Sequence, residues 1–256
     1  MFTFATTIKD QKIKANCQKV FKNAIGALFQ ILNKVSEKFD IFDENFALGF
    51  GFSYFFLERR GDYYQILSVD YQKNPFKQKT DDITMSLAIH NMQSEMIFTA
   101  KVKPVPTVFK NTMIVLRQAM KANDVYLTRT SPADKNDSGW YLGLTDDEHE
   151  DDHKADDFIK LPVCELLKIR PIGLRALSMP VGTLVTISGN SITAVVDEND
   201  EPIPFSSDEE LKRREKEQNA KIAQQLEEAK KKADETKRKQ EQQKPKLKLL
   251  TEEDGD

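Results

Sequence analysis

The sequence contains few of the residues on which disulfide-rich and secreted proteins depend. It holds two cysteines, Cys17 and Cys164, in 256 residues, and they form no CxxC pair. We therefore expect no disulfide framework and a reducing, cytoplasmic environment. No apolar run approaches the roughly 20 residues that a transmembrane helix needs. The N-terminus lacks a basic region leading into an apolar stretch, so neither a secretory signal nor a membrane partner is predicted.

Catalytic signatures are also scarce. No serine lies in a G-x-S-x-G elbow, so Ser138 near His149 does not predict a hydrolase. Residues 49–51, Gly-Phe-Gly, lack the third glycine of a dinucleotide loop and instead favour a close approach of two chains or a bulge. His90 lies in a predicted helix, where a structural role is the simplest interpretation. We expect no enzymatic activity and no cofactor.

Charge of one sign is not in excess over the whole chain. The sequence has 38 Lys and Arg against 41 Asp and Glu, for a formal net charge of -3. This balance provides no general attraction to nucleic acid or anionic membranes, and no direct nucleic acid binding is expected. Hydrophobic residues make up 39% of the chain and include 16 Phe, enough for a core in one large domain or two small ones.

Residues 1–122 read as an N-terminal α+β domain built of a helix, a β-hairpin and a helix. Apolar residues three and four apart predict an amphipathic helix from about Lys12 to Phe39. The aromatic-rich stretches 46–57 and 63–69 predict strands, joined by a turn at Arg-Arg-Gly-Asp, residues 59–62. A helix is expected over 83–99 and a second one over 107–122.

Residues 123–205 read as a small, mostly antiparallel sheet domain. Strands are expected over 124–130, 140–144, 183–187 and 191–196, and a short helix over 164–169. Ser188-Gly189-Asn190 is typical of a hairpin turn. From 206 to 256 the composition becomes polar and charge-balanced, which predicts a long charged helical tail to about Gln243 with a disordered end. The fold class is therefore α+β.

The most unusual segment is an acidic loop, defined as Asp146 to Asp157. Eight carboxylates crowd it: Asp146, Asp147, Glu148, Glu150, Asp151, Asp152, Asp156 and Asp157. A solvated loop relieves their repulsion and is the plainest interpretation. His149 and His153, four apart, would share one face of a helix and suit zinc, which leaves a metal site open. The third interpretation is a surface that binds a partner.

The partner interpretation follows from electrostatics. An acidic patch steers a basic partner and raises its association rate, and the basic clefts of nucleases are suitable targets. Trp140 stands just before this loop; a core position is favoured for it, but an exposed Trp would anchor an interface. The candidate partner-binding residues are Trp140, Asp146, Asp147, Glu148, Glu150, Asp151 and Asp152. No catalytic residue and no metal ligand is assigned.

Two motifs connect this segment with a known family. Residues 137–140 read Asp-Ser-Gly-Trp, an acid-rich stretch with Asp156-Asp157-Phe158 follows, and residues 179–183 close it with Met-Pro-Val-Gly-Thr. Together they resemble a bacterial immunity-protein domain, immunity family thirty-three, formerly a domain of unknown function. The resemblance covers about residues 123–196. The sequence departs from the family pattern at residues 144–147 and 154–158, around the acidic loop.

The resemblance implies a protein that protects a bacterium from a toxin. We therefore expect a cytoplasmic, non-enzymatic protein that binds a cognate protein toxin, such as a secretion-system effector, and occludes its active site. Two rivals are an adaptor that recruits partners through its charged tail and a metal-dependent enzyme centred on His149 and His153. The sequence does not define the toxin or the oligomeric state.

Overall fold

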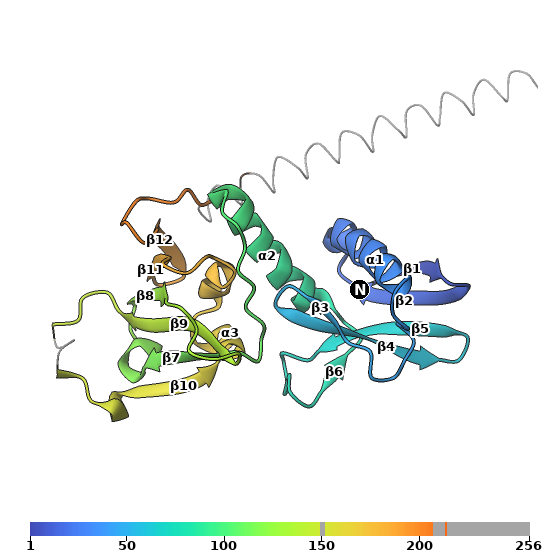
Figure 1. The fold of residues 1–256 in the computed structure, drawn as a ribbon, viewed down its shortest axis with the longest axis horizontal. Helices are drawn as coiled ribbons and strands as arrows, with labels where there is room; N and C mark the ends of the chain where they lie inside the picture. Colours follow the sequence, from blue (N-terminus) through green and yellow to red (C-terminus); the bar gives the residue numbers. More distant parts are fainter. Residues whose placement is uncertain (149–151, 207–212, 214–256) are drawn as a thin grey trace, which may run out of the picture. The chain divides into compact units, whose positions relative to one another are not determined.

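A computed structural model describes residues 1–148, 152–206 and 213 (Figure 1). Met1–Ser206 form one compact unit. Within it lie two mixed sheets and few helices, which confirms the expected α+β class. The predicted tail helix falls outside the described residues, as do His149, Glu150 and Asp151. No described helix has the length and apolar character needed to cross a membrane.

Sheet A is formed by the first part of the chain. Its strands follow the order β1-β2-β5-β4-β3, and β6 also pairs with β5. Among the described strands of this sheet, only β2 and β5 are parallel neighbours, with Ile13 opposite Tyr64. The bounds are β1 Phe2–Ile8, β2 Gln11–Cys17, β3 Leu48–Phe50, β4 Ser53–Arg60, β5 Tyr63–Val69 and β6 Lys79–Thr80. The predicted turn before β5 is confirmed, with Gly61 at a φ of 63°.

The predicted helix over 12–39 is correct in its middle and wrong at its start. Helix α1 spans Lys22–Ser36, the 3-10 segment η1, Lys19–Phe21, directly precedes it, and residues 12–17 belong to strand β2. In β2 the buried Ile13, Ala15 and Cys17 alternate with more exposed side chains, which is the period of a strand. The β1–β2 hairpin therefore precedes the helix, β-hairpin and helix that the sequence predicts.

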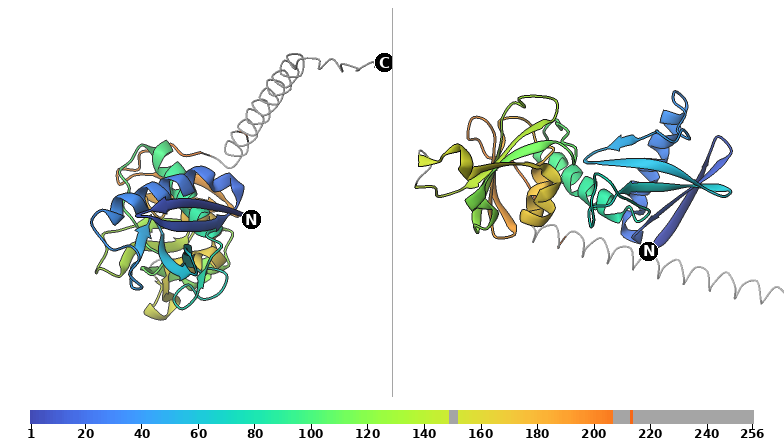
Figure 2. Two further views of the ribbon diagram at one scale, coloured as in Figure 1. Left: turned by 90° about the vertical axis from the view of Figure 1, so that its right-hand side faces the viewer. Right: turned by 90° about the horizontal axis from the view of Figure 1, so that it is seen from below.

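The helices cover one face of sheet A. Ile25, Leu28 and Leu32 of α1 pack with Phe55 of β4 and Ile66 of β5, and none is more than 1% exposed. Burying one such side chain contributes about 1.5–3 kcal/mol, so this layer stabilises the fold strongly. Figures 1 and 2 show α1 on this side of the strands and no described helix on the opposite face.

Sheet B is formed by residues 112–196. Its order is β10-β7-β9-β8-β11-β12, and β7 and β9 are its only parallel neighbours in the described chain. The strands are β7 Thr112–Leu116, β8 Asp124–Arg129, β9 Asp137–Leu144, β10 Phe158–Pro162, β11 Leu184–Ser188 and β12 Ser191–Val196. Short helical segments are η2 Arg117–Met120, η4 Ala155–Asp157, η5 Val163–Glu165, α3 Leu166–Ile169 and η6 Pro171–Ala176. The predicted hairpin at Gly189 is confirmed.

The predicted helix over 107–122 is wrong. Strand β7 occupies residues 112–116, followed by the short 3-10 segment η2. In β7 the buried Met113 and Val115 flank Ile114, whose surface is 47% exposed. The apolar residues of this stretch fit either period, and pairing with both β9 and β10 decides for the strand.

Helix α2, Thr84–Ala100, links the two cores and confirms the helix predicted over 83–99. Leu87 packs in the sheet A core, whereas Ile89 and Met96 pack in the sheet B core. The buried Gln93 donates to the carbonyl of Leu174 at 3.1 Å and accepts from the hydroxyl of Ser178 at 3.1 Å. These bonds fix α2 against η6 and the chain that follows it.

Candidate functional site

The acidic loop joins the end of β9 to the start of β10. Asp146, Glu148 and Asp152 are exposed, whereas Asp147 is half-buried. Residues 149–151 lie outside the described chain, so the candidates Glu150 and Asp151 have no structural test. Asp156 is exposed as well and Asp157 is half-buried, so the described part of the loop has four exposed and two half-buried carboxylates.

His153 holds the inner side of this loop. Its Nε2 lies 2.7 Å from Oδ2 of Asp147, and its Nδ1 lies 3.8 Å from Oδ2 of Asp157. The side chain of His153 is 8% exposed and that of Asp147 is 12% exposed. The imidazole also meets the ring of Phe158 edge-on, with centroids 5.8 Å apart. Asp147 thus anchors the loop, in contrast to its exposed neighbours.

A short 3-10 turn closes the loop onto β10. The backbone N–H of Lys154 donates to Asp157 at 2.8 Å, and the N–H of Asp157 donates to the carbonyl of Lys154 at 2.9 Å. The Arg117 guanidinium donates to the carbonyl of Asp156 at 2.9 Å, which ties this turn to the end of β7. The carboxylates therefore sit on a loop whose C-terminal end is fixed.

Asp124 adds negative charge at the same end of the sheet. Its carbonyl accepts from the N–H of Thr145, the first residue after β9. Hydrogen bonds from the Ser188 hydroxyl and the Asn123 amide lower the pKa of Asp124 below its usual value. This carboxylate is ionised at neutral pH and contributes to the same field as Asp146.

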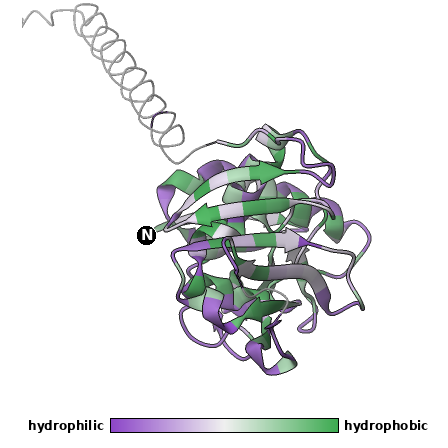
Figure 3. Ribbon diagram, turned by 90° about the vertical axis from the view of Figure 1, so that its left-hand side faces the viewer, coloured by the Kyte–Doolittle hydropathy of each residue, from purple (hydrophilic) through white to green (hydrophobic). Residues whose placement is uncertain are grey.

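Partly exposed aromatic rings lie on the face of sheet B that bears no described helix. Tyr126 and Tyr141 have ring centroids 5.7 Å apart, and Tyr141 and Phe158 have centroids 6.2 Å apart. Gly143 lies beneath the two tyrosines: a Cβ there would come within 2.8 Å of Tyr126 and 2.7 Å of Tyr141. With Ile114 these rings form what we call the sheet-B outer face; Figure 3 views this end of the molecule, with strands in front of helical segments.

Trp140, the other sequence candidate, lies on the opposite side of β9. Its surface is 1% exposed, and its indole N–H donates to the carbonyl of Leu177 at 3.2 Å. This confirms the favoured core interpretation. A partner does not reach this ring directly in the described structure, because the ring is buried in the core.

A buried cation holds the two resemblance motifs together. Arg129, 2% exposed, donates to the carbonyls of Ser138 at 3.1 Å and Met179 at 2.5 Å. Further acceptors are the carbonyls of Val105 and Leu177 and the hydroxyl of Thr107. Its guanidinium carbon lies 5.4 Å from the Trp140 ring centroid. We call this set the Arg129 junction.

Charge on Arg129 is retained at neutral pH. Burial lowers the pKa of this guanidinium to about 10, which still leaves it protonated. The backbone joins the same two motifs, since the N–H of Arg129 donates to Thr183 and its carbonyl accepts from Gly182. The Asp-Ser-Gly-Trp and Met-Pro-Val-Gly-Thr motifs are therefore parts of one buried structure.

Glycine is required in the first motif. Gly139 has a φ of 74°, and a Cβ there would lie 2.0 Å from the carbonyl oxygen of Thr130. Both the left-handed backbone and the close approach exclude a larger residue. Asp137 reinforces the turn by accepting from the N–H groups of Ala133 at 2.8 Å and Gly139 at 3.1 Å.

The described residues give no support to the hypothesis of a metal site at His149 and His153. Within them, no group of three or more histidine, cysteine and carboxylate side chains has an arrangement that holds a metal ion. His149 lies outside them, and the described contacts of His153 are with carboxylates and the Phe158 ring. We therefore assign no metal role here.

Sequence reasoning did not select Tyr126, Tyr141 or Ile114 as site residues. A signal for them exists in the alternation of each strand: Val125 and Leu127 flank Tyr126, and Trp140 and Leu142 flank Tyr141. In both strands the flanking residues are buried and the tyrosine faces outward. Two neighbouring strands with this pattern predict an aromatic outer face.

Comparison with known families confirms the resemblance. Residues 92–198 match the model of the Imm33-like domain. The match begins within α2 and includes β7, thirty-one residues before the start predicted from the motifs (123 − 92). No curated protein and no solved structure matches the chain.

Proposed function

We propose that the protein is a non-enzymatic immunity protein that binds a cognate bacterial toxin in the cytoplasm and occludes its active site. The Imm33-like domain supports the general class. The observation that carries the proposal is the placement of exposed carboxylates beside the partly exposed rings of the sheet-B outer face. That combination is characteristic of a binding surface, because interfaces pair central aromatic anchors with a charged rim.

Each part of this surface has a different task in binding. Asp146, Glu148 and Asp152 attract a basic partner from a distance and set the association rate. Tyr126 lines a hollow together with Asp147, and the ring of Tyr141 contacts that of Phe158, which in turn meets His153. Both tyrosines therefore lie beside the loop and supply rigid, amphipathic contact area. A toxin with a basic catalytic cleft, such as a nuclease, would place that cleft against the carboxylates, which would then exclude its phosphate-bearing substrate.

The remaining sequence candidates support the surface from within. Asp147 contacts His153 and holds the loop, while Trp140 fixes β9 from the core. We assign both to positioning of the surface and not to contact with the toxin. Glu150 and Asp151 stay predicted contacts.

The direct test reverses the three exposed carboxylates of the loop that are candidate contacts from the sequence. The variant Asp146→Lys, Glu148→Lys, Asp152→Lys is assayed for binding to the toxin encoded beside its gene and for protection of cells that express that toxin. The matched control reverses three exposed carboxylates elsewhere, Glu37→Lys, Glu44→Lys and Glu201→Lys. We expect the loop variant to weaken binding by about 10- to 100-fold and the control by less than about threefold. Equal effects would refute the acidic mechanism.

A second pair of variants separates the aromatic face from the charges. Ile114→Asp places a charge among the rings of the outer face. The control is Val181→Asp, because Val181 is 40% exposed and Ile114 is 47% exposed. We expect the first to reduce the toxin complex lifetime and the second to leave it unchanged. If neither variant changes the lifetime of the toxin complex, the interface lies elsewhere on the protein.

The adaptor alternative is tested by removing the tail. Ser206 belongs to the compact unit, because its carbonyl accepts from Arg175 at 2.8 Å. Truncation should therefore begin at residue 207. An immunity protein that acts through the acidic loop keeps protecting after this deletion, whereas an adaptor that recruits through its tail fails.

A further inference from the structure

The face of sheet A that bears no described helix carries three lysines held over aromatic rings. Lys14 Nζ lies 3.6 Å from the Tyr63 ring centroid, Lys79 Nζ lies 3.9 Å from that of Phe56, and Lys110 Nζ lies 5.0 Å from that of Tyr54. We call these three pairs the lysine–aromatic face. Each ring positions an ammonium group at the surface and restricts its side chain.

Strand register brings these groups together in a strip. Lys14 pairs with Gln65, which pairs with Glu58, so one row crosses β2, β5 and β4. The next rows along the strands hold Leu67 opposite Phe56, and Val69 opposite Lys79. Successive rows on one face are about 6.7 Å apart, so the cations line a path along the sheet.

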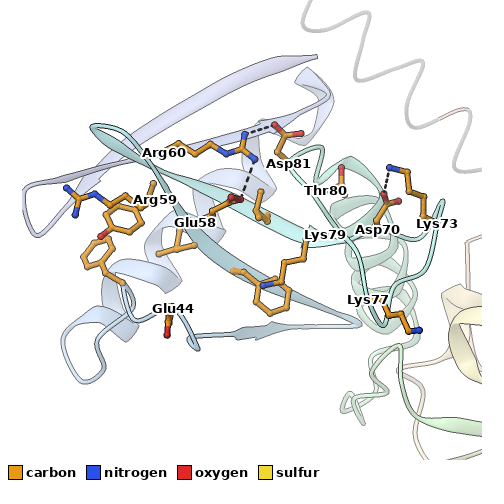
Figure 4. Close-up of a pocket in the computed structure, with 15 residues that line it drawn as sticks. Glu44, Glu58, Arg59, Arg60, Asp70, Lys73, Lys77, Lys79, Thr80 and Asp81 are labelled. Carbon is orange, nitrogen blue, oxygen red and sulfur yellow. Dashed lines mark hydrogen bonds and ion pairs between the residues drawn. The ribbon is translucent and has the colours of Figure 1, made fainter.

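Two hollows lie along this strip. The larger, of about 870 Å³, is lined by Phe56, Glu58, Arg60, Lys79 and Asp81 among others (Figure 4). The smaller, of about 250 Å³, has an apolar floor of Phe76 and Phe109 and an edge formed by Lys110. Phe56, Lys77 and Lys79 line both hollows, which are therefore adjacent.

Of the four carboxylates that line the larger hollow, Glu58, Asp70 and Asp81 form ion pairs, and Glu44 is exposed at its edge. Arg60 lies 3.5 Å from Glu58 and 3.2 Å from Asp81, and Lys73 lies 3.6 Å from Asp70 (Figure 4). Across residues 1–148 and 152–206, no ion pair is found for Lys14, Lys79 or Lys110. The strip therefore combines neutralised acids with cations that have only a ring as partner.

We propose that the lysine–aromatic face docks an acidic, extended polypeptide segment of a partner protein, with an apolar side chain of that segment in the Phe76 hollow. Carboxylates complement ammonium groups at fixed spacings. A nucleic acid strand fits less well, because its continuous phosphates would meet Glu58 and Asp81, and because the lysines cover the rings on which bases stack. The site is separate from the acidic loop in both residues and charge.

The test measures binding of a labelled peptide of about eight residues, glutamate at alternate positions with one central leucine, long enough to follow the strip. The peptide's glutamine counterpart and an oligothymidylate serve as comparison ligands. The full chain is compared with the variant Lys14→Glu, Lys79→Glu, Lys110→Glu and with its glutamine version, should the first fail to fold. The matched control is Lys22→Glu, Lys34→Glu, Lys38→Glu, which reverses three exposed lysines near or on α1.

We expect the acidic peptide to bind the full chain, more weakly at about 0.15 M than at low ionic strength. The lysine–aromatic variant should weaken it by about tenfold or more, and the control by less than about twofold. Reversal of the acidic loop should not weaken it, so this result is independent of toxin binding. The proposal is overturned if the glutamine peptide binds equally, if the control loses as much, or if oligothymidylate binds more tightly.

Discussion

The Arg129 junction and the acidic loop lie at opposite ends of the same strand and follow opposite physical rules. At the start of β9 a buried guanidinium satisfies backbone carbonyls, and Gly139 admits no Cβ. At its end, the side chains of Asp146 and Glu148 are exposed to solvent. Substitution is therefore costly at one end and tolerated at the other.

This contrast explains why the family resemblance depends on these two motifs. The two motifs that carry it are the segments that Arg129 holds together, so they mark the fold of the domain. The sequence departs from the family pattern around residues 144–147 and 154–158, at the loop. Since a surface loop accepts change without loss of stability, it is the part of the domain in which partner specificity can vary.

The largest expected effect is the loss of the buried cation. Arg129→Met keeps the apolar stem but leaves the carbonyls of Ser138, Leu177 and Met179 without this donor. We expect a loss of about 3–5 kcal/mol in the free energy of unfolding, measured by urea denaturation. Arg117→Met, an exposed arginine that also bonds a carbonyl, is the control and should cost less than about 1 kcal/mol. Equal costs would remove the distinction between junction and surface.

The next largest effect on stability is expected from the substitution of glycine by alanine at two positions, Gly139 and Gly26. Gly139→Ala forces a Cβ against Thr130 in a left-handed backbone, so we expect a loss of about 2–4 kcal/mol. Gly26 lies in α1, where an added Cβ would have no atom within 4 Å, and Gly26→Ala should stabilise the protein by about 0.5–1 kcal/mol. Thermal unfolding of both variants is the measurement. A stable Gly139→Ala protein would contradict the close approach seen here.

The variant Trp140→Phe distinguishes a role of Trp140 in the core from a direct contact with the toxin. The variant loses the indole donor to Leu177 and part of the packed volume, and we expect a cost of about 2 kcal/mol. Binding of the toxin by the folded fraction should stay within about twofold of the original. The opposite result, unchanged unfolding with lost binding, would restore Trp140 as an interface anchor.

Much of the fold could be predicted from the sequence because its strong signals are local. The hairpin turns at Gly61 and Gly189 and helix α2 rest on turn chemistry and on apolar periodicity. The two helix predictions that are wrong concern β2 and β7, and strand β1 was not predicted. The apolar residues of β7 fit both periods, and its parallel pairing with the distant β9 leaves no local signal. The buried residues of β2 alternate as in a strand, and β2 forms a local hairpin with β1, so this error overlooked a signal that the sequence contains.

The candidate site was predictable in its charge and not in its geometry. The carboxylate run identifies the loop, but composition does not show that Asp147 turns inward to His153. Arg129 carries no signal either: all but one of its acceptors are backbone carbonyls, which every residue has, from segments up to fifty residues away. The lysine–aromatic face escapes detection for the same reason, since each of its pairs joins residues that are far apart in the sequence.

The smallest expected effect concerns Asp137, a carboxylate of the Asp-Ser-Gly-Trp motif, whose contribution to stability is compared with that of the loop carboxylates. Partial burial works to raise the pKa of Asp137, but N–H groups of Ala133 and Gly139, with the charge of Lys160, outweigh it and hold the pKa below its ordinary value. A carboxyl group with a lowered pKa in the folded state contributes stability above the unfolded pKa of about 4, and this contribution disappears as pH falls through the folded pKa.

Asp137→Asn keeps an acceptor oxygen and removes only the charge. Because solvent screens this site in part, we expect a cost of about 0.5 kcal/mol at pH 7 that vanishes in acid, measured by urea denaturation across the pH range. Asp146→Asn, at an exposed position in the loop, should leave the curve of stability against pH unchanged or raise it slightly through reduced repulsion. If the two variants gave the same pH dependence, the carboxylates at the two ends of β9 would not differ in environment, and the assignment of one to the fold and the others to a partner would lose its electrostatic basis.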